Sequence, residues 1–188
     1  SGRTALYLLL KSLLADPAYQ GRRRVILPAY TCPSLAKVVL DLGLESWLVD
    51  IAPTTFAYAL PELAAQLNEQ TLAVLLVHPF GIPQALAPVQ QLTAQVGAVL
   101  IEDAAQSLGA MVAGKPVGTM GDYGLFSLGP GKPLSTGGGG FVCAHDPVKI
   151  NRLAETWRTL PKPAASASGL ALARLAAFTL AFHPQGWW

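Results

Sequence analysis

The run Leu72–Val77 constrains the fold most, because its six residues include no polar side chain. A strand of this kind is buried on both faces of a sheet, as in parallel sheets covered by helices. Helix-like and strand-like segments alternate around it, which predicts an α/β fold with a mainly parallel mixed sheet flanked by helices. The expected helices cover residues 4–14, 34–42, 60–68 and 85–96, and the expected strands cover residues 24–27, 45–50, 72–77 and 98–101.

The pattern changes after Gly109. Glycine becomes dense up to Gly140 and no helical periodicity survives, so short strands and loops are expected, including strands at 124–128 and 140–144. A helix is expected over 147–159. The predicted organisation is one domain over residues 1–160, a linker-like stretch rich in proline, alanine and serine over 161–169, and an apolar helix and tail over 170–188.

Composition narrows the possible partners. Only 13% of the residues are charged and 52% are hydrophobic, compared with about 25% and about 45–50% on average. Some apolar surface is therefore expected to be covered by a partner or by further chain. The net charge is +2, and the one basic cluster, Arg22–Arg24, is expected to be a solvated turn. No aromatic-rich basic face accompanies this cluster, which argues against nucleic-acid binding.

The two cysteines, Cys32 and Cys143, form no CxxC or metal-ligand pattern. No metal site is expected, and a reducing compartment, the cytoplasm, is the expected location. No apolar run approaches the roughly 18 residues that a membrane span needs. Paired tryptophans favour bilayer interfaces, so contact of residues 170–188 with a membrane surface stays open as an alternative to packing against protein.

Polar residues follow three of the expected strands. Pro28–Cys32, His78–Gly81 and Glu102–Ser107 each come directly after an apolar run. Ligands of open α/β sheets bind beyond the carboxyl ends of the strands. Each segment alone could be an ordinary helix cap or turn, but their joint placement predicts one site.

The glycine-rich segment around Lys132 is a further candidate for ligand binding. A phosphate-binding loop of the GxxxxGK[ST] type does not fit, because position 126 is Phe and Pro133 follows the lysine. A GxGxxG motif also fails, because position 134 is Leu. A flexible loop with a solvated lysine is the plain alternative. Dense glycine instead favours a backbone that approaches a ligand closely.

Several motifs occur in a fixed order over residues 1–158, and Lys132 lies five residues after Ser127. They are Ser1–Leu6, Val25–Thr31, Val49–Ile51, Val77–Gly81, Ile101–Ala110, Gly118, Gly121–Asp122, Phe126–Ser127, Lys132 and Thr136–Gly137. Together they resemble the DegT/DnrJ/EryC1/StrS family of pyridoxal-phosphate (PLP) enzymes. The resemblance implies the large domain of a fold-type I aminotransferase.

The resemblance also assigns roles around the cofactor ring. Lys132 would be the Schiff-base lysine and proton carrier, and Asp103 would keep the pyridine nitrogen protonated. Gln106 would lie near the phenolic oxygen. Family members usually carry an aromatic residue that stacks on the ring where this chain has Cys32. An acidic residue of the family's glycine motif is replaced by Gly138.

The cofactor phosphate resembles one held by the start of the first helix, at Arg3 and Thr4, together with the Ser127 hydroxyl. Backbone N–H groups and the helix dipole favour an anion at such a helix end. The threonine is one position later here than in the family, after Gly2 and Arg3.

The implied activity is transfer of an amino group, with glutamate as donor, to a nucleotide-linked keto sugar for polysaccharide biosynthesis, by a homodimer. A sugar dehydratase of the same family is one alternative, although those carry histidine at the lysine position. A non-catalytic or regulatory relative is another. Family members are longer, and nothing after residue 158 resembles their second half, so the 188-residue chain is expected to be inactive alone.

Overall fold

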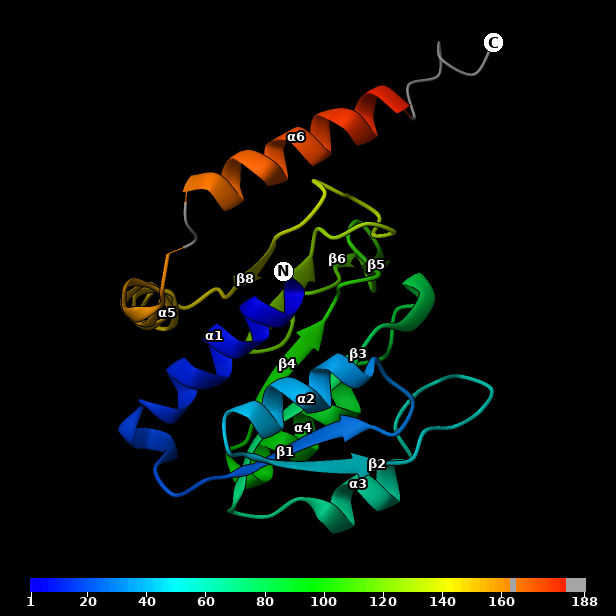
Figure 1. Cartoon of the computed structure of the whole chain (residues 1–188). Coiled ribbons are helices and arrows are strands. Elements are labelled where there is room, and N and C mark those ends of the chain that lie inside the picture. The colour runs from blue at the N-terminus through cyan, green and yellow to red at the C-terminus, as the bar shows by residue number, and fades with distance from the viewer. Residues whose placement is uncertain (163–164, 182–188) are drawn as a thin grey trace.

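The computed structural model describes residues 1–162 and 165–181, without the side chains of residues 165–168. Its centre is a six-stranded sheet in the order β2-β1-β3-β4-β7-β8 (Figure 1). The first five strands in this order run parallel to one another, and β8 is antiparallel to β7. The predicted mainly parallel mixed sheet is therefore confirmed. Its strands are β1 (Arg24–Pro28), β2 (Glu45–Val49), β3 (Thr71–Val77), β4 (Val99–Asp103), β7 (Tyr123–Ser127) and β8 (Gly140–Cys143).

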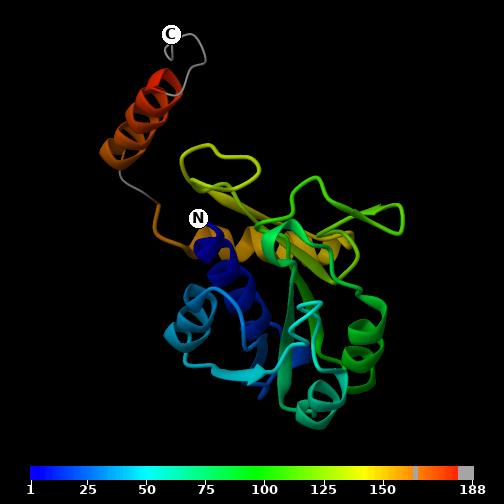
Figure 2. The same cartoon turned by 90° about the vertical axis from the view of Figure 1, so that its right-hand side faces the viewer.

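Helices cover both faces of this sheet. Figure 2 shows α1 and α2 on one side and α3 and α4 on the other. The domain also contains a short hairpin of two strands, β5 (Met111–Val112) and β6 (Lys115–Pro116). There are two short 3-10 helices among the described residues, η1 (Pro17–Tyr19) and η2 (Pro79–Gly81). The helices are α1 (Gly2–Leu14), α2 (Pro33–Asp41), α3 (Leu60–Gln66), α4 (Ala87–Val96), α5 (Pro147–Thr159) and α6 (Ala165–Ala181).

The apolar run in β3 is buried on both faces, as expected. Ala73 and Leu75 pack in the core that includes α1 and α2, whereas Val74 and Leu76 pack in the core that includes α3 and α4. Successive side chains of a strand point to opposite faces. A strand in this central position therefore needs a continuous apolar run rather than an alternating one.

Two of the three arginines of the Arg22–Arg24 cluster contact protein groups, contrary to the sequence-based prediction of a solvated turn, whereas Arg23 is exposed. Arg22 Nη1 donates to the carbonyl oxygens of Thr71 at 2.8 Å and Val96 at 2.9 Å. The guanidinium carbon of Arg24 lies 3.5 Å from the centroid of the Trp47 ring. The planar guanidinium can reach two carbonyls or stack on an aromatic face, and charge counting along the sequence does not reveal either.

The linker-like stretch predicted at 161–169 is wrong for residues 165–169, which belong to α6. Alanine favours a helix and serine tolerates one, and composition typical of linkers does not exclude it. Residues 182–188, including the paired tryptophans, lie outside the described residues. Across the described part of the chain, no helix has the length and hydropathy that crossing a membrane requires.

The close contact between Gly118 and Gly124 leads to a test of the fold. A Cβ atom on Gly124 would lie 1.8 Å from the carbonyl oxygen of Gly118. We expect Gly124→Ala to lower the free energy of unfolding by about 3 kcal/mol, because backbone must move to make room. Gly169→Ala is the control, since a Cβ there meets no atom within 4 Å. Equal unfolding midpoints in urea for both variants would contradict this packing.

Candidate functional site

A cleft of about 630 Å³ lies at the carboxyl ends of β1, β3, β4 and β7. The start of α1 and the glycine-rich loop between β7 and β8 complete its walls. Four parallel strands end at this edge, so segments distant in the sequence meet there. Six of the residues singled out by sequence line the cleft: Arg3, Cys32, Asp103, Gln106, Ser127 and Lys132.

Asp103 is the last residue of β4, and only 6% of it is exposed. Its Oδ1 accepts the N–H of Ala105 at 2.9 Å. Burial raises the pKa of the Asp103 carboxyl, and this effect outweighs the bond from Ala105 and the nearby charge of Lys132. A carboxylate held in this way favours a cationic or N–H donor partner from a ligand.

Gln106 is oriented by a backbone group of the next loop. Its Oε1 accepts the N–H of Phe80 at 2.9 Å, which leaves the side-chain NH₂ group available to donate into the cleft. Phe80 has φ of 56°, in the left-handed region that is costly for a phenylalanine. The bond to Gln106 therefore joins a strained loop position to the floor of the cleft.

The start of α1 and the end of β7 meet closely. A Cβ atom on Gly2 would lie 2.9 Å from Cβ of Ser127 and 3.2 Å from its Oγ. Only glycine lets the helix approach the serine this far. The N–H groups of a first helical turn have no intrahelical partner. Together with the Ser127 hydroxyl and the Arg3 side chain, they form a surface suited to an anion.

Thr4 does not line the cleft, in contrast to the expectation from the sequence. Its N–H donates to Ser1 Oγ at 3.3 Å, and its own Oγ1 lies 3.1 Å from the same atom. The helix begins at Gly2, two residues earlier than predicted, because Ser1 is its N-cap. This start turns the Thr4 side chain toward neighbouring surface hollows instead.

Lys132 is half-buried on the loop between β7 and β8. Its N–H donates to the carbonyl of Gly129 at 3.2 Å. The ends of the loop are joined by the N–H of Leu128 to Gly139 and by the N–H of Thr136 to Leu128, at 3.2 and 3.1 Å. This closure holds the lysine over the cleft that contains Asp103.

Cys32 is exposed at the N-cap of α2, with Sγ 3.1 Å from Ser34 Oγ. Hydrogen bonds from Ser34 lower the pKa of the Cys32 thiol, and the charge of Lys132 acts in the same direction. Two exposed aromatic side chains, Tyr30 and Phe80, also line the cleft, with ring centroids 6.2 Å apart. Both belong to motifs that carry the family resemblance, but neither was predicted to contact the cofactor.

Two further residues of the cleft were also missed. Thr31 Oγ1 is buried and has no hydrogen-bond partner among the described residues. His78 has no exposed surface and pairs with Glu102, the neighbour of Asp103. Both lie in segments that were predicted to contribute to a site because they directly follow apolar strands. No sequence pattern indicates the burial or pairing of either side chain.

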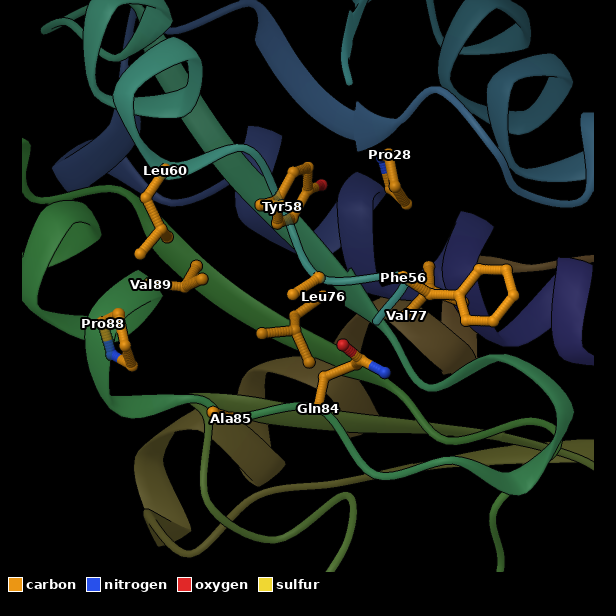
Figure 3. A pocket seen from close by; sticks show the side chains of 11 residues that line it. Pro28, Phe56, Tyr58, Leu60, Leu76, Val77, Gln84, Ala85, Pro88 and Val89 are labelled. Atoms are coloured by element: carbon orange, nitrogen blue, oxygen red, sulfur yellow. The ribbon is translucent and has the colours of Figure 1, made fainter. Parts of the chain in front are cut away.

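A second cavity of about 190 Å³ lies beside the cleft and is lined by apolar residues except for Gln84. Figure 3 shows the Gln84 side chain near Leu76 and Val77. None of the predicted site residues contributes to it. Val77 lines both the cavity and the cleft, and the backbone N–H of Gln84 donates to Nδ1 of His78 at 2.9 Å.

The sheet order and the cleft define an α/β domain with a cleft beyond the ends of its parallel strands, the place where open α/β sheets bind ligands. The chain belongs to the DegT/DnrJ/EryC1/StrS aminotransferase family, whose model matches residues 1–167. This confirms the family resemblance of the sequence motifs.

Individual relatives support the same assignment. The chain is 35% identical over 147 residues to UDP-N-acetyl-3-dehydro-alpha-D-glucosamine 3-aminotransferase of Acidithiobacillus ferrooxidans, covering 78% of this chain and 39% of that protein. The sugar aminotransferase CalS13 of Micromonospora echinospora superposes with a TM-score of 0.71 and 35% identity, covering 81% and 42% of the two chains.

A structure of the E. coli GDP-4-keto-6-deoxy-D-mannose-3-dehydratase with bound hydrated PLP is also similar. Its TM-score is 0.74 at 26% identity, covering 82% of this chain and 40% of that one. The chain thus spans about two fifths of the length of the relatives that it matches.

Proposed function

We propose that this chain is the cofactor-binding part of a PLP-dependent aminotransferase that acts on a nucleotide-linked keto sugar, with glutamate as amino donor. The observation that best supports this proposal is that four residues from three different segments line one cleft: Asp103, Gln106, Ser127 and Lys132. The names of the similar proteins support the reaction and the substrate class.

The residues of the cleft fit PLP. Asp103 offers a buried carboxylate for the pyridine nitrogen, and Gln106 offers N–H donors for the phenolic oxygen. The close approach of Gly2 to Ser127 forms a cradle for a phosphate. Thr31 Oγ1, buried without a partner among the described residues, is a further group that a bound ligand could satisfy.

When bound, PLP supplies an electron sink for the charge that develops as a proton leaves the amino donor. Lys132 Nζ would hold the cofactor covalently and then move that proton. The Asp103 carboxylate would keep a proton on the ring nitrogen, where the positive charge is needed. The N–H groups at the start of α1 and the Ser127 hydroxyl would anchor the phosphate and fix the ring over Asp103.

The dehydratase alternative is disfavoured by Lys132, because family dehydratases resemble this chain but carry histidine at that position. A non-catalytic relative is also disfavoured, since a lysine and a buried carboxylate are both kept in the cleft. We further propose a homodimer, because 52% of the residues are hydrophobic and large apolar side chains such as Met111 and Leu134 are exposed. Two free cysteines favour the reducing cytoplasm.

The proposed function predicts that the 188-residue chain alone transaminates at background level. An open cleft admits water, which weakens electrostatic contacts and hydrolyses the bond to the lysine. The assay mixes the chain with PLP, glutamate and a set of nucleotide-linked keto sugars. The similar sugar aminotransferase CalS13 is the positive control and should be active. Strong turnover by the 188-residue monomer would refute this expectation.

A further inference from the structure

His78 and Glu102 form a buried polar pair beside the cleft, outside the chemistry assigned so far. Their side chains have no exposed surface, and His78 Nε2 lies 3.3 Å from Glu102 Oε2. His78 follows β3, and Glu102 precedes Asp103 in β4. A buried carboxylate is costly unless every oxygen has a donor, so its presence here calls for a role.

The hydrogen bonds assign the protonation of both groups. The N–H of Gln84 donates to His78 Nδ1 at 2.9 Å, so Nδ1 carries no proton. The neutral imidazole then has its proton on Nε2 and donates to Glu102. Burial alone would raise the pKa of Glu102, but the bond from His78 and those from three backbone N–H groups lower it below its usual range.

Those three backbone donors belong to the segment that precedes β7. Glu102 Oε2 also accepts the N–H of Gly118 at 2.8 Å, while Oε1 accepts the N–H groups of Met120 and Gly121. The carboxylate therefore receives four donors in all. A fully satisfied buried network of this kind is rigid, because any movement leaves a charge unpaired.

The backbone of His78 is bonded to the segment that forms the floor of the cleft. Its N–H donates to the carbonyl of Asp103 at 3.1 Å, and its carbonyl accepts the Ser107 hydroxyl at 2.9 Å. The segment from Asp103 to Ser107 is thus held at both ends by His78. This segment contains Gln106, whose Oε1 is bonded to Phe80 two residues after His78.

We propose that His78, paired with Glu102, is a positioning residue that sets the Asp103 carboxylate and the Gln106 amide against the cofactor ring. The role rests on the proposed function, because it requires a ring with a nitrogen that meets Asp103. His78 itself makes no step of the reaction. It acts through the backbone that joins the ends of β3 and β4.

Two substitutions test separately the two hydrogen bonds of the imidazole, the one to Glu102 and the one from Gln84. In His78→Gln, the amide NH₂ reaches the position of Nε2 and keeps the bond to Glu102. In His78→Asn, the amide oxygen takes the position of Nδ1 and accepts from Gln84, but the side chain is too short to reach Glu102. Loss of the Glu102 bond should lower PLP affinity about tenfold in His78→Asn. His78→Gln should stay within about threefold of the unmodified protein.

The decisive comparison uses a second ligand, a PLP analogue in which C–H replaces the ring nitrogen. The analogue cannot bond to Asp103 but still meets Gln106, so its affinity in His78→Asn should fall by less than about threefold, compared with about tenfold for PLP. Both dissociation constants are measured by fluorescence titration of the full-length gene product. Leu63→Ala, buried in α3 away from the cleft, is the control for general loss of stability and should weaken neither ligand.

Equal losses for the two ligands in His78→Asn, or unchanged PLP affinity, would overturn the positioning role alone. If the unmodified protein bound no PLP, the proposed function would fail together with it. Nitrogen NMR of the unmodified protein tests the pair without any variant. The chain has three histidines, and the signal of His78 should show a neutral ring with its proton on Nε2. A doubly protonated or Nδ1-protonated ring at neutral pH would contradict the network.

Discussion

Replacement of Lys132 by alanine should reduce transamination by the full-length protein about 1,000-fold or more, because the variant loses the group that holds the cofactor and moves the proton. Affinity for PLP should fall less, since the phosphate contacts and Asp103 remain. The measurement is turnover with glutamate and a nucleotide-linked keto sugar at saturating PLP. Added small amines should restore part of the activity by replacing the missing proton carrier.

Lys115→Ala is the matched control for this experiment. Lys115 is an exposed lysine in the short hairpin strand β6 and does not line the cleft. Its replacement should leave turnover within about twofold, as is usual for surface changes that touch no partner. Comparable losses in the two lysine variants, or normal turnover in Lys132→Ala, would show that the lysine has been wrongly assigned.

Asp103→Asn should lower turnover about 100-fold or more while part of the PLP affinity remains, because a neutral amide cannot hold a positive charge on the ring nitrogen. The asparagine oxygen can still accept the N–H of Ala105, so the local fold should persist. Turnover and PLP affinity are measured on the same preparation. Near-normal turnover would show that Asp103 is only a cap for the loop that follows β4.

The same variant should raise the thermal stability of the cofactor-free protein at neutral pH. Burial raises the pKa of Asp103 in the folded state. The folded protein therefore binds this proton more tightly than the unfolded chain. The stability that the protonated carboxyl contributes is lost as the pH rises through the raised pKa. Above it, the charged carboxylate destabilises the fold and asparagine does not. The gain in Tm should shrink as the pH falls from the raised pKa toward the ordinary carboxyl pKa, and it should be absent below both.

The sheet could be predicted from the sequence because its signals are local. The apolar run of β3 requires burial on both faces, and Gly97 ends α4 in the left-handed conformation that glycine adopts freely. Ligands of open α/β sheets bind beyond the carboxyl ends of the strands. This rule and the order of the motifs predicted that Asp103, Gln106 and Lys132 lie at one edge of the sheet. Each of these inferences uses residue types whose meaning does not depend on distant partners.

What could not be predicted depends on contacts between distant segments. The Ser1 cap moves the start of α1 and turns Thr4 away from the cleft. The partners of Arg22 are carbonyls that lie 49 and 74 residues further along the chain. The pairing of His78 with Glu102 likewise spans two strands. Such contacts follow from packing, which neither periodicity nor composition encodes.

The central claim, that this cleft binds PLP through Lys132, is tested most directly by chemical trapping. The full-length protein is incubated with PLP and reduced with borohydride, and the labelled peptide is identified by mass spectrometry. We predict a single stable label on the Nζ of Lys132, lost in Lys132→Ala. Label on Lys37 or Lys115 instead, or no label under conditions where PLP is bound, would contradict the account.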